Sequence, residues 1–272
     1  MYTILYLRWL SSLAGLVFTT LSMQASADHS WGKYHWARTS SPFTLSLGDN
    51  VSPSWEPFLN SSALDWSVSN MLDTTVAAGG ANPKNCRPTK GRVEVCNSTY
   101  GNTGWLGIAQ IWLSGSHITQ AITKVNDTYF NTPSYNTPEW KTFVMCQEIG
   151  HTLGLDHQDV AFDNPNLGSC MDYTNNPAGP LSNEHPNTHD YAQLESIYWH
   201  FDSTNTVVQN ASSTPSPGNA SDANGPPWGR VVKTYADGRP SLYELDLGGR
   251  HKLLTFVIWT QEHRGQKGIG GH

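Results

Sequence analysis

The sequence contains few charged residues and few basic ones. Charged residues make up 14% of the 272 residues, and 16 Lys and Arg stand against 22 Asp and Glu, which gives a formal net charge of −6. Nucleic acids and anionic membrane surfaces attract proteins through clustered Lys and Arg. We therefore expect neither of them as a partner.

The sequence also lacks an apolar run long enough for a stable membrane span. Arg8 precedes an apolar run that is interrupted by Ser and Thr and ends near Leu21, and a triplet of small residues ends at Ala27. A span needs about 20 apolar residues, whereas this layout is that of a secretory signal peptide. We expect residues 1–27 to be cleaved before Asp28, leaving a secreted, extracellular or periplasmic protein without a membrane anchor.

Cysteine is scarce, and no pair has the C-x-x-C spacing. Exported cysteines are usually oxidised, so disulfides are expected rather than thiolate metal ligands. Four cysteines allow three pairings. We favour Cys86–Cys96, which closes a short loop, together with Cys146–Cys170.

Hydrophobic patterning predicts strands and helices that alternate along most of the chain. Strands are expected at 43–48, 73–78, 92–96, 105–113 and 117–125, and helices at 55–71, 138–155 and 188–199. Gly, Asn and Pro turn signals bound the strands. The pattern indicates an α/β (α+β) fold in one main domain, residues 28–202.

The last two predicted helices have well-defined end signals. Thr137 can cap the first, Pro138 suits its first turn, and Gly154 can end it in the left-handed conformation. Asn187 can cap the second, with Asp190 three residues further on.

The composition changes after the last predicted helix. Residues 203–227 lack aromatic residues and periodicity, so we expect a flexible linker there. Residues 228–272 contain short alternating runs separated by Asp-Gly and Gly-Gly turn signals, which predict a small β-rich segment. Because so small a unit has little core of its own, we expect it to dock on the main domain.

The segment from Gln147 to His157 carries the strongest chemical signal. Gln147 and His151 are four residues apart, so on a helix they share one face, and Glu148 lies beside them. Gly154 lets the chain turn, so that His157 can return to the same metal ion. Two imidazoles beside a carboxylate suit zinc and a water whose pKa the metal lowers to about 7, with Glu148 as general base and acid.

Residues 147–157 resemble the zinc-binding signature of the metzincin metallopeptidases, H-E-x-x-H-x-x-G-x-x-H. Met171 falls where that family has its Met-turn, and Tyr173 matches a Tyr of the astacin and serralysin branches. The resemblance covers roughly residues 35–202. It implies a metzincin-like catalytic domain with a twisted mixed sheet, an active-site helix, a Met-turn and a C-terminal helix. It also implies a zinc ion, with Tyr173 stabilising the oxyanion or ligating the metal when no substrate is bound.

Position 147 departs from the family pattern, which has His there. A glutamine oxygen is a weaker zinc donor than an imidazole. Three explanations stay open. In the first, Gln147 ligates the metal through its carbonyl oxygen, and in the second, His185 or His189 completes the site. In the third, the chain is an inactive relative that binds a peptide or glycan. The retained Glu148, the two site histidines and Met171 favour an active site.

The resemblance also gives the second disulfide a purpose. Cys146 directly precedes Gln147, and Cys170 directly precedes Met171, so a bond between the cysteines would pin the Met-turn beneath the metal. Such a bond closes a loop of about 24 residues and contributes on the order of 3 kcal/mol. A zinc-bound thiolate from either cysteine is the less favoured alternative.

The substrate-binding region follows from the same resemblance. Residues 105–113 would form the sheet edge beside the cleft, where an extended peptide pairs as an added strand.

The remaining histidines, among them His35, His117 and His200, are expected to be ordinary polar residues. The sequence therefore predicts a monomeric, secreted zinc endopeptidase that acts on peptide or protein substrates.

Overall fold

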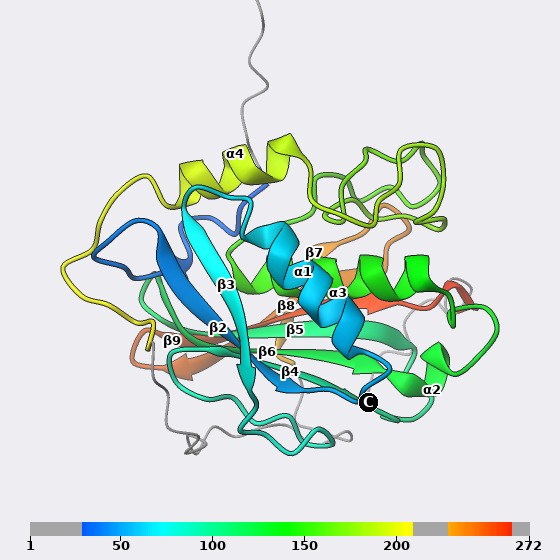
Figure 1. The fold of residues 1–272 in the computed structure, drawn as a ribbon, viewed down its shortest axis with the longest axis horizontal. Helices are drawn as coiled ribbons and strands as arrows, with labels where there is room; N and C mark the ends of the chain where they lie inside the picture. Colours follow the sequence, from blue (N-terminus) through cyan, green and yellow to red (C-terminus); the bar gives the residue numbers. More distant parts are fainter. Residues whose placement is uncertain (1–28, 209–227, 263–272) are drawn as a thin grey trace, which may run out of the picture.

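The computed structural model describes residues 29–208 and 228–262 of the chain (Figure 1). The expected signal peptide and most of the expected linker lie outside the described residues. The division of the chain into a main domain, a linker and a β-rich segment therefore stays a prediction.

The described residues form four helices and nine strands. The helices are α1 (Glu56–Trp66), α2 (Asp127–Phe130), α3 (Pro138–Thr152) and α4 (Thr188–Ile197). The strands are β1 (His35–Trp36), β2 (Phe43–Asn50), β3 (Leu72–Ala78), β4 (Val93–Ser98), β5 (Trp105–Ser114), β6 (His117–Asn126), β7 (Arg230–Thr234), β8 (Pro240–Gly248) and β9 (His251–Trp259). All eight elements predicted within the main domain are confirmed, while β1 and α2 were not expected.

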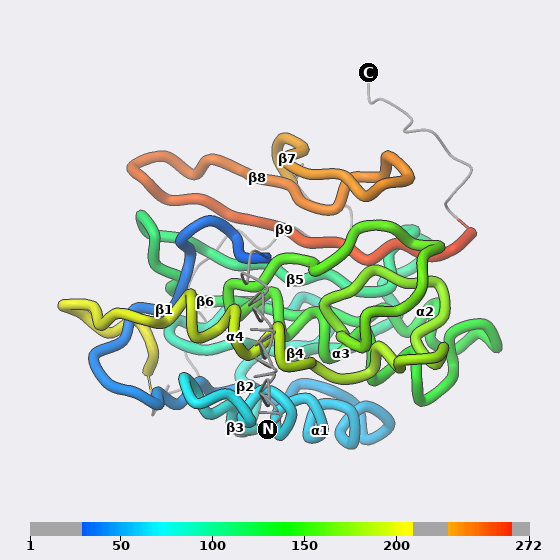
Figure 2. Tube along the Cα trace, turned by 90° about the horizontal axis from the view of Figure 1, so that it is seen from above, coloured from blue at the N-terminus to red at the C-terminus, as the bar shows by residue number. Residues whose placement is uncertain are grey.

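The strands form one mixed sheet in the order β3-β2-β4-β6-β5-β9-β8-β7, and β1 pairs with β6. The pairs among β2, β3, β4 and β6 are parallel, whereas those among β6, β5, β9, β8 and β7 are antiparallel. Figure 2 shows the C-terminal strands at the edge opposite to β3. This arrangement confirms a mixed α/β fold.

Helices α1 and α3 cover one face of the sheet (Figure 1). Gly107 on β5 lets α3 lie unusually close. A Cβ atom at this position would lie 2.5 Å from Glu148 Oε1 and 2.7 Å from Val144 Cγ1, so a side chain here would force its neighbours on α3 to shift. Gly107 thus allows the C-terminal half of α3 to rest directly on the sheet.

The predicted helix ends are confirmed. The Thr137 side chain accepts a hydrogen bond from the backbone N–H of Trp140 at the start of α3. Gly154 follows α3 with φ of 100°. Asn187 and Asp190 form a reciprocal capping box at the start of α4. These local bonds satisfy backbone groups that a helix end otherwise leaves unpaired.

The prediction that residues 105–113 form a sheet edge is wrong. β9 pairs antiparallel along the outer side of β5, with Ile108 opposite Val257 and Ala109 opposite Phe256. The physical reason is burial, because Leu254, Phe256 and Ile258 join the main hydrophobic core from this position. The pairing also satisfies the backbone groups that an open edge would expose.

Within the part of the chain that the structure describes, no helix has both the length and the apolar character needed to cross a membrane.

Candidate metal centre

The end of α3 and the turn after it bring the predicted ligands together. Gln147, Glu148 and His151 lie in the last two turns of α3, and the chain reverses at Gly154. His157 then returns toward the helix, and the His151 and His157 ring centroids are 4.6 Å apart. The local turn thus places two imidazoles beside each other.

His151 has the protonation pattern of a metal ligand. Its Nδ1 lies 2.9 Å from the carbonyl oxygen of Leu155, and because a carbonyl can only accept, Nδ1 carries the proton. Nε2 therefore has a free lone pair, and it is buried without a hydrogen-bond partner. Burial lowers the pKa of His151 well below its usual value, which keeps the ring neutral. Metal-bound histidines commonly donate their other N–H to a carbonyl in this way.

Gln147 is oriented by two backbone carbonyls. Its Nε2 donates to the carbonyl oxygens of Cys170, at 2.6 Å, and Asp172, at 3.0 Å. The side-chain oxygen Oε1 is buried and has no partner. The hydrogen bonds therefore leave the oxygen, the atom that can bind a cation, free for a ligand.

Glu148 is fully buried, and neither carboxyl oxygen has a hydrogen-bond partner. Burial raises its pKa well above the usual value. Without a nearby cation the carboxyl group is neutral, because an ionised carboxylate here would lack solvation and partners.

His157 is linked to a carboxylate and to a tyrosine. Its Nδ1 lies 3.6 Å from Asp156 Oδ1, and its Nε2 lies 3.4 Å from the hydroxyl of Tyr235. Burial works against ionisation of Asp156, but hydrogen bonds and charges from His157 and Lys233 outweigh it and lower the pKa of Asp156 to about 2. Asp156 is therefore an anion that holds the His157 ring from behind, as carboxylates do at metal sites.

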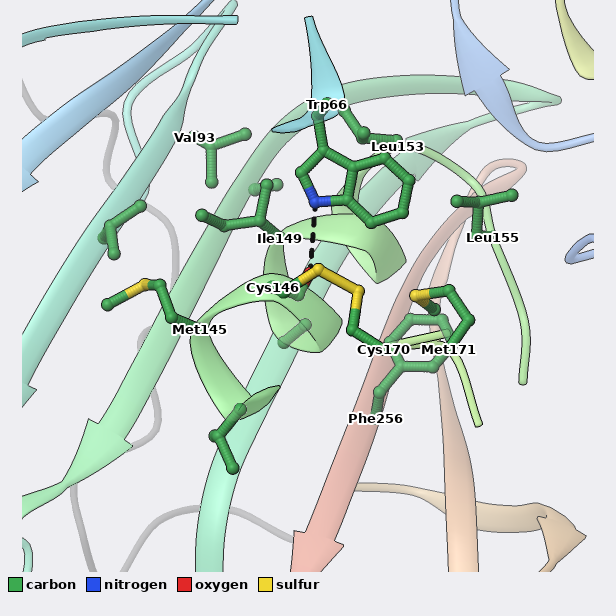
Figure 3. Packing of buried hydrophobic residues seen from close by; sticks show 14 of the residues in the cluster. Trp66, Val93, Met145, Cys146, Ile149, Leu153, Leu155, Cys170, Met171 and Phe256 are labelled. Carbon is green, nitrogen blue, oxygen red and sulfur yellow. Dashed lines mark hydrogen bonds between the residues drawn. A yellow bond between two sulfur atoms is a disulfide. The ribbon is translucent and has the colours of Figure 1, made fainter. Parts of the chain in front are cut away.

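Both expected disulfides are present, Cys86–Cys96 and Cys146–Cys170. Neither Cys146 nor Cys170 is therefore a thiolate zinc ligand. Figure 3 shows the second disulfide beside Trp66, whose Nε1 donates to the carbonyl oxygen of Cys146 at 3.2 Å. Met171 follows directly and packs beneath α3, where a Cβ on Gly150 would lie 2.5 Å from its sulfur. The disulfide thus ties the segment of Met171 to the helix that carries the ligands.

Removing this crosslink should weaken both the fold and the metal centre. We expect the double variant Cys146→Ala and Cys170→Ala to lose about 3 kcal/mol of unfolding free energy. For a domain of this size that is a fall in Tm of roughly 6–12 °C. Zinc retention should fall as well, measured by dialysis and mass spectrometry. The matched control, in which Cys86 and Cys96 are replaced by Ala, should lower Tm but keep zinc. Equal zinc retention in both variants would contradict this account.

The C-terminal strands close the candidate centre. The Phe256 ring stacks on the His151 ring, with centroids 4.5 Å apart and an interplanar angle of 12°. Tyr235, in the turn after β7, stacks on Tyr173 with centroids 3.6 Å apart. His151 and Tyr173 have no exposed surface as a result. The centre is therefore closed to solvent and to substrate in this conformation.

Tyr173 lies at the rim of the centre, 6.4 Å from His157 between ring centroids. Arg239 donates a hydrogen bond of 2.6 Å from Nη2 to the Tyr173 hydroxyl. The same guanidinium is held by Asp237 and by the carbonyl oxygen of Thr260. A residue of the turn between β7 and β8 thus binds the hydroxyl to which the sequence assigns a catalytic role, and that role stays a prediction.

His185 and His189 lie in other environments. His185 Nδ1 is 2.7 Å from Asp65 Oδ2, and the His189 ring stacks on that of His29 at 4.8 Å. Among the residues that the structure describes, neither joins a group of three His, Cys, Asp or Glu with ligand atoms within 4.8 Å of one another. Their partners are therefore Asp65 and His29, and not residues of the centre on α3.

Sequence reasoning missed the residues that cover the centre, Tyr235, Arg239 and Phe256. Each lies in the β-rich segment, and each contacts a residue near the motif only through tertiary structure. The alternating pattern predicted the strands but carried no signal for their neighbours.

The residues present fit a divalent metal ion. Gln147 Oε1 and His151 Nε2 are buried without hydrogen bonds, as are both Glu148 oxygens, and His157 Nε2 has only the Tyr235 hydroxyl, at 3.4 Å, as a neighbour. Unpaired buried polar atoms cost free energy, and so many at one place point to a missing partner. Two imidazoles and a neutral oxygen donor suit zinc, with the carboxyl group beside rather than among the ligands.

Comparisons with known proteins found distant structural similarity. No family model matches the chain, and no curated protein matches it. The solved structure of myroilysin aligns with 60% of this chain and 82% of its own, at 12% identity and a TM-score of 0.34. High choriolytic enzyme 1, a hatching enzyme zinc-protease from Oryzias latipes (medaka fish), aligns with 60% of this chain and 94% of its own, at 10% identity and a TM-score of 0.33. We therefore base the functional proposal on the site.

Proposed function

We propose that this chain is a secreted zinc-dependent endopeptidase with a metzincin-like catalytic domain, held closed by its C-terminal strands. The observation that carries the proposal is the buried Glu148 carboxyl, unpartnered beside the free donor atoms of Gln147 and His151. A purely structural carboxyl group would be hydrogen-bonded at this depth. A carboxyl group kept unpaired beside metal donors is suited to proton transfer.

In the open enzyme each residue of the site has a separate role. His151, His157 and Gln147 would hold zinc, which would supply Lewis acidity toward the substrate carbonyl and toward water. Glu148 accepts the proton of the attacking water and delivers it to the leaving amine. The Tyr173 hydroxyl, once released from Arg239, donates to the carbonyl oxygen as negative charge develops there.

Cleavage requires the C-terminal strands to move. β9 occupies the side of β5 where an extended peptide would pair, and Tyr235 lies beside His157. Substrate therefore has access to neither the strand nor the ligands while β9 is docked. We infer that the closed conformation is latent.

The second candidate is an inactive relative of the peptidases that holds a peptide or glycan. The closed centre and the Gln at position 147 favour it, because an open site and a third imidazole are what catalysis needs most. The two functions differ in whether an opened, zinc-loaded protein cleaves peptides.

Zinc content and casein cleavage test the proposal. The chain without residues 1–27 should retain zinc by mass spectrometry, and its cleavage of casein, measured after mild denaturant loosens the fold, should stop on adding a chelator. Glu148→Gln should keep the zinc but lower the cleavage rate by about 10²–10⁴-fold.

Glu139→Gln, in the first turn of the same helix, is the matched control and should leave cleavage unchanged. A protein that retains no zinc would refute the proposal. Zinc retention without cleavage under any opening condition would favour the inactive relative.

A further inference from the structure

Three histidines converge on one oxygen of Asp202, away from α3. The distances to Asp202 Oδ1 are 3.1 Å from His117 Nε2, 3.4 Å from His35 Nε2 and 3.8 Å from His200 Nε2. His35 begins β1 and His117 begins β6, whereas His200 and Asp202 follow α4. Segments far apart in the sequence therefore contribute to this cluster.

The tautomer of His35 is fixed by the backbone. Its Nδ1 lies 2.7 Å from the carbonyl oxygen of Lys33, so Nδ1 must carry the proton of the neutral ring. Nε2 then directs a lone pair toward Asp202 Oδ1, which is also an acceptor. Two acceptors at this distance repel each other unless a second proton on the ring or a metal cation lies between them. A metal-bound histidine shows the same pattern, with its second N–H donated to a carbonyl.

The carboxylate itself is held rigidly. Asp202 Oδ2 accepts a hydrogen bond from the backbone N–H of Arg38 at 3.0 Å, and the Asp202 N–H donates to the Arg38 carbonyl at 2.8 Å. Only Oδ1 remains for the three imidazoles, and one oxygen has lone pairs for about two hydrogen bonds. Protonated rings alone would therefore leave one histidine unsatisfied.

Among the described residues, the ion pairs of Asp202 are those with His35, His117 and His200. The charge of the nearby Arg38 guanidinium is directed elsewhere, toward the carbonyl oxygens of Ser40 and Tyr198. Asp202 Oδ1 therefore faces the imidazoles rather than the guanidinium.

The spacing suits a tetrahedral ion. Zinc bound at about 2.0–2.1 Å separates its ligand atoms by roughly 3.3–3.4 Å, close to the three distances to Asp202 Oδ1. The ligand atoms of His35, His200 and Asp202 all lie within 4.8 Å of one another. The His35 ring meets the rings of His117 and His200 edge-on, at 81° and 77°, so the rings converge rather than stack.

A cation can reach the cluster without any opening of the fold. A surface pocket lined by Lys33, Ser196 and Trp199 also includes His35 and His200. The side chains of His117 and His200 are 31% and 33% exposed. In this respect the cluster differs from the closed centre on α3.

We propose that His35, His200 and Asp202, with His117 beside Asp202, form a second zinc site that clips the segment after α4 to the sheet. This segment also pairs with the two residues after β1, through the Asp202 N–H and through a bond of 3.0 Å from the Thr206 N–H to the Ala37 carbonyl. The ion adds a crosslink between chain segments that only a few backbone bonds otherwise join.

Zinc stoichiometry distinguishes this site from the one on α3. Native mass spectrometry with Zn²⁺ should find two ions on the unmodified chain, one on His200→Gln, one on His151→Ala and none on the double variant. Loss of an ion in His200→Gln but not in His151→Ala would support this site and refute the other. An unchanged ion count in His200→Gln, together with an unchanged count in His117→Gln, would overturn the inference.

The matched control is His185→Gln, which breaks a histidine–aspartate pair outside the cluster and should bind zinc like the unmodified chain. Co²⁺ provides an independent readout, because tetrahedral cobalt has intense visible absorption bands. Asp202→Asn should weaken binding at this site by more than about tenfold and remove its share of those bands. Bands that persist at full intensity would contradict the assignment.

Discussion

Phe256→Ala is expected to destabilise the protein by about 3–5 kcal/mol and to open the metal centre. The Phe256 ring is fully buried in the main core and stacks on His151. Removing a buried phenylalanine leaves a cavity that the surroundings fill only partly. The expected fall in Tm is roughly 6–20 °C for a domain of this size.

The opening is measured separately, as the rate at which zinc is lost to an excess of chelator. We expect that rate to rise more than about tenfold in Phe256→Ala, on the scale of metal-site changes. The control is Val257→Ala, because Val257 is also buried on β9 but packs on the opposite face of the sheet. It should lower Tm by less and leave the rate unchanged. An equal rise in both variants would show that general destabilisation, not the cover on His151, controls zinc loss.

Zinc itself should supply a large share of the stability. A ligand at 100 to 1,000 times its Kd stabilises the folded state by about 2.7–4.1 kcal/mol. Chelation should therefore lower Tm by roughly 5–16 °C. This measurement is made on the His200→Gln variant, in which only the centre on α3 is expected to bind zinc and so to stabilise the fold.

Substitutions at the ligands should change how strongly zinc raises Tm. His151→Ala should abolish the response of Tm to zinc, and Gln147→Ala should weaken it. Gln147→His should tighten zinc binding by about tenfold or more, since an imidazole is the stronger donor. His189→Ala is the control, and zinc should change its Tm as it changes the Tm of the His200→Gln parent. A Gln147→Ala variant that binds zinc as tightly as before would exclude Gln147 as a ligand.

The parts of the fold that were predicted correctly depend on local signals. Thr137 caps α3 and Asn187 caps α4 through bonds that span only a few residues. The alternation of Phe43, Leu45 and Leu47 likewise reports which face of β2 is buried. Such signals are read directly from neighbouring residues, because the interactions that produce them are themselves between neighbours.

The position of β9 could not be predicted in this way. An alternating run reports that one face of a strand is buried, but it does not name the strand's partner. Ile108 and Val257 pair across more than half of the chain, and only the three-dimensional structure decides between an open and a filled edge at β5.

The two candidate metal sites differ in the same way, because one is built from neighbouring residues and the other from distant ones. Gln147, Glu148, His151 and His157 lie within one short segment, so helical spacing and the turn at Gly154 bring them together. The cluster at Asp202 takes its histidines from separate elements. Singly, each of them was expected to be an ordinary polar residue, because no spacing in the sequence relates one to another.

The place of β9 between β5 and β8 also affects the rates at which a metal ion enters and leaves the centre. Residues 251–259 are synthesised after α3, yet they are the residues that cover His151. A folding chain therefore passes through a stage at which the ligands exist and their cover does not, and a metal ion enters most easily then. Once β9 has docked, the lifetime of the bound ion is set by how often the strand detaches rather than by the strength of the donors alone.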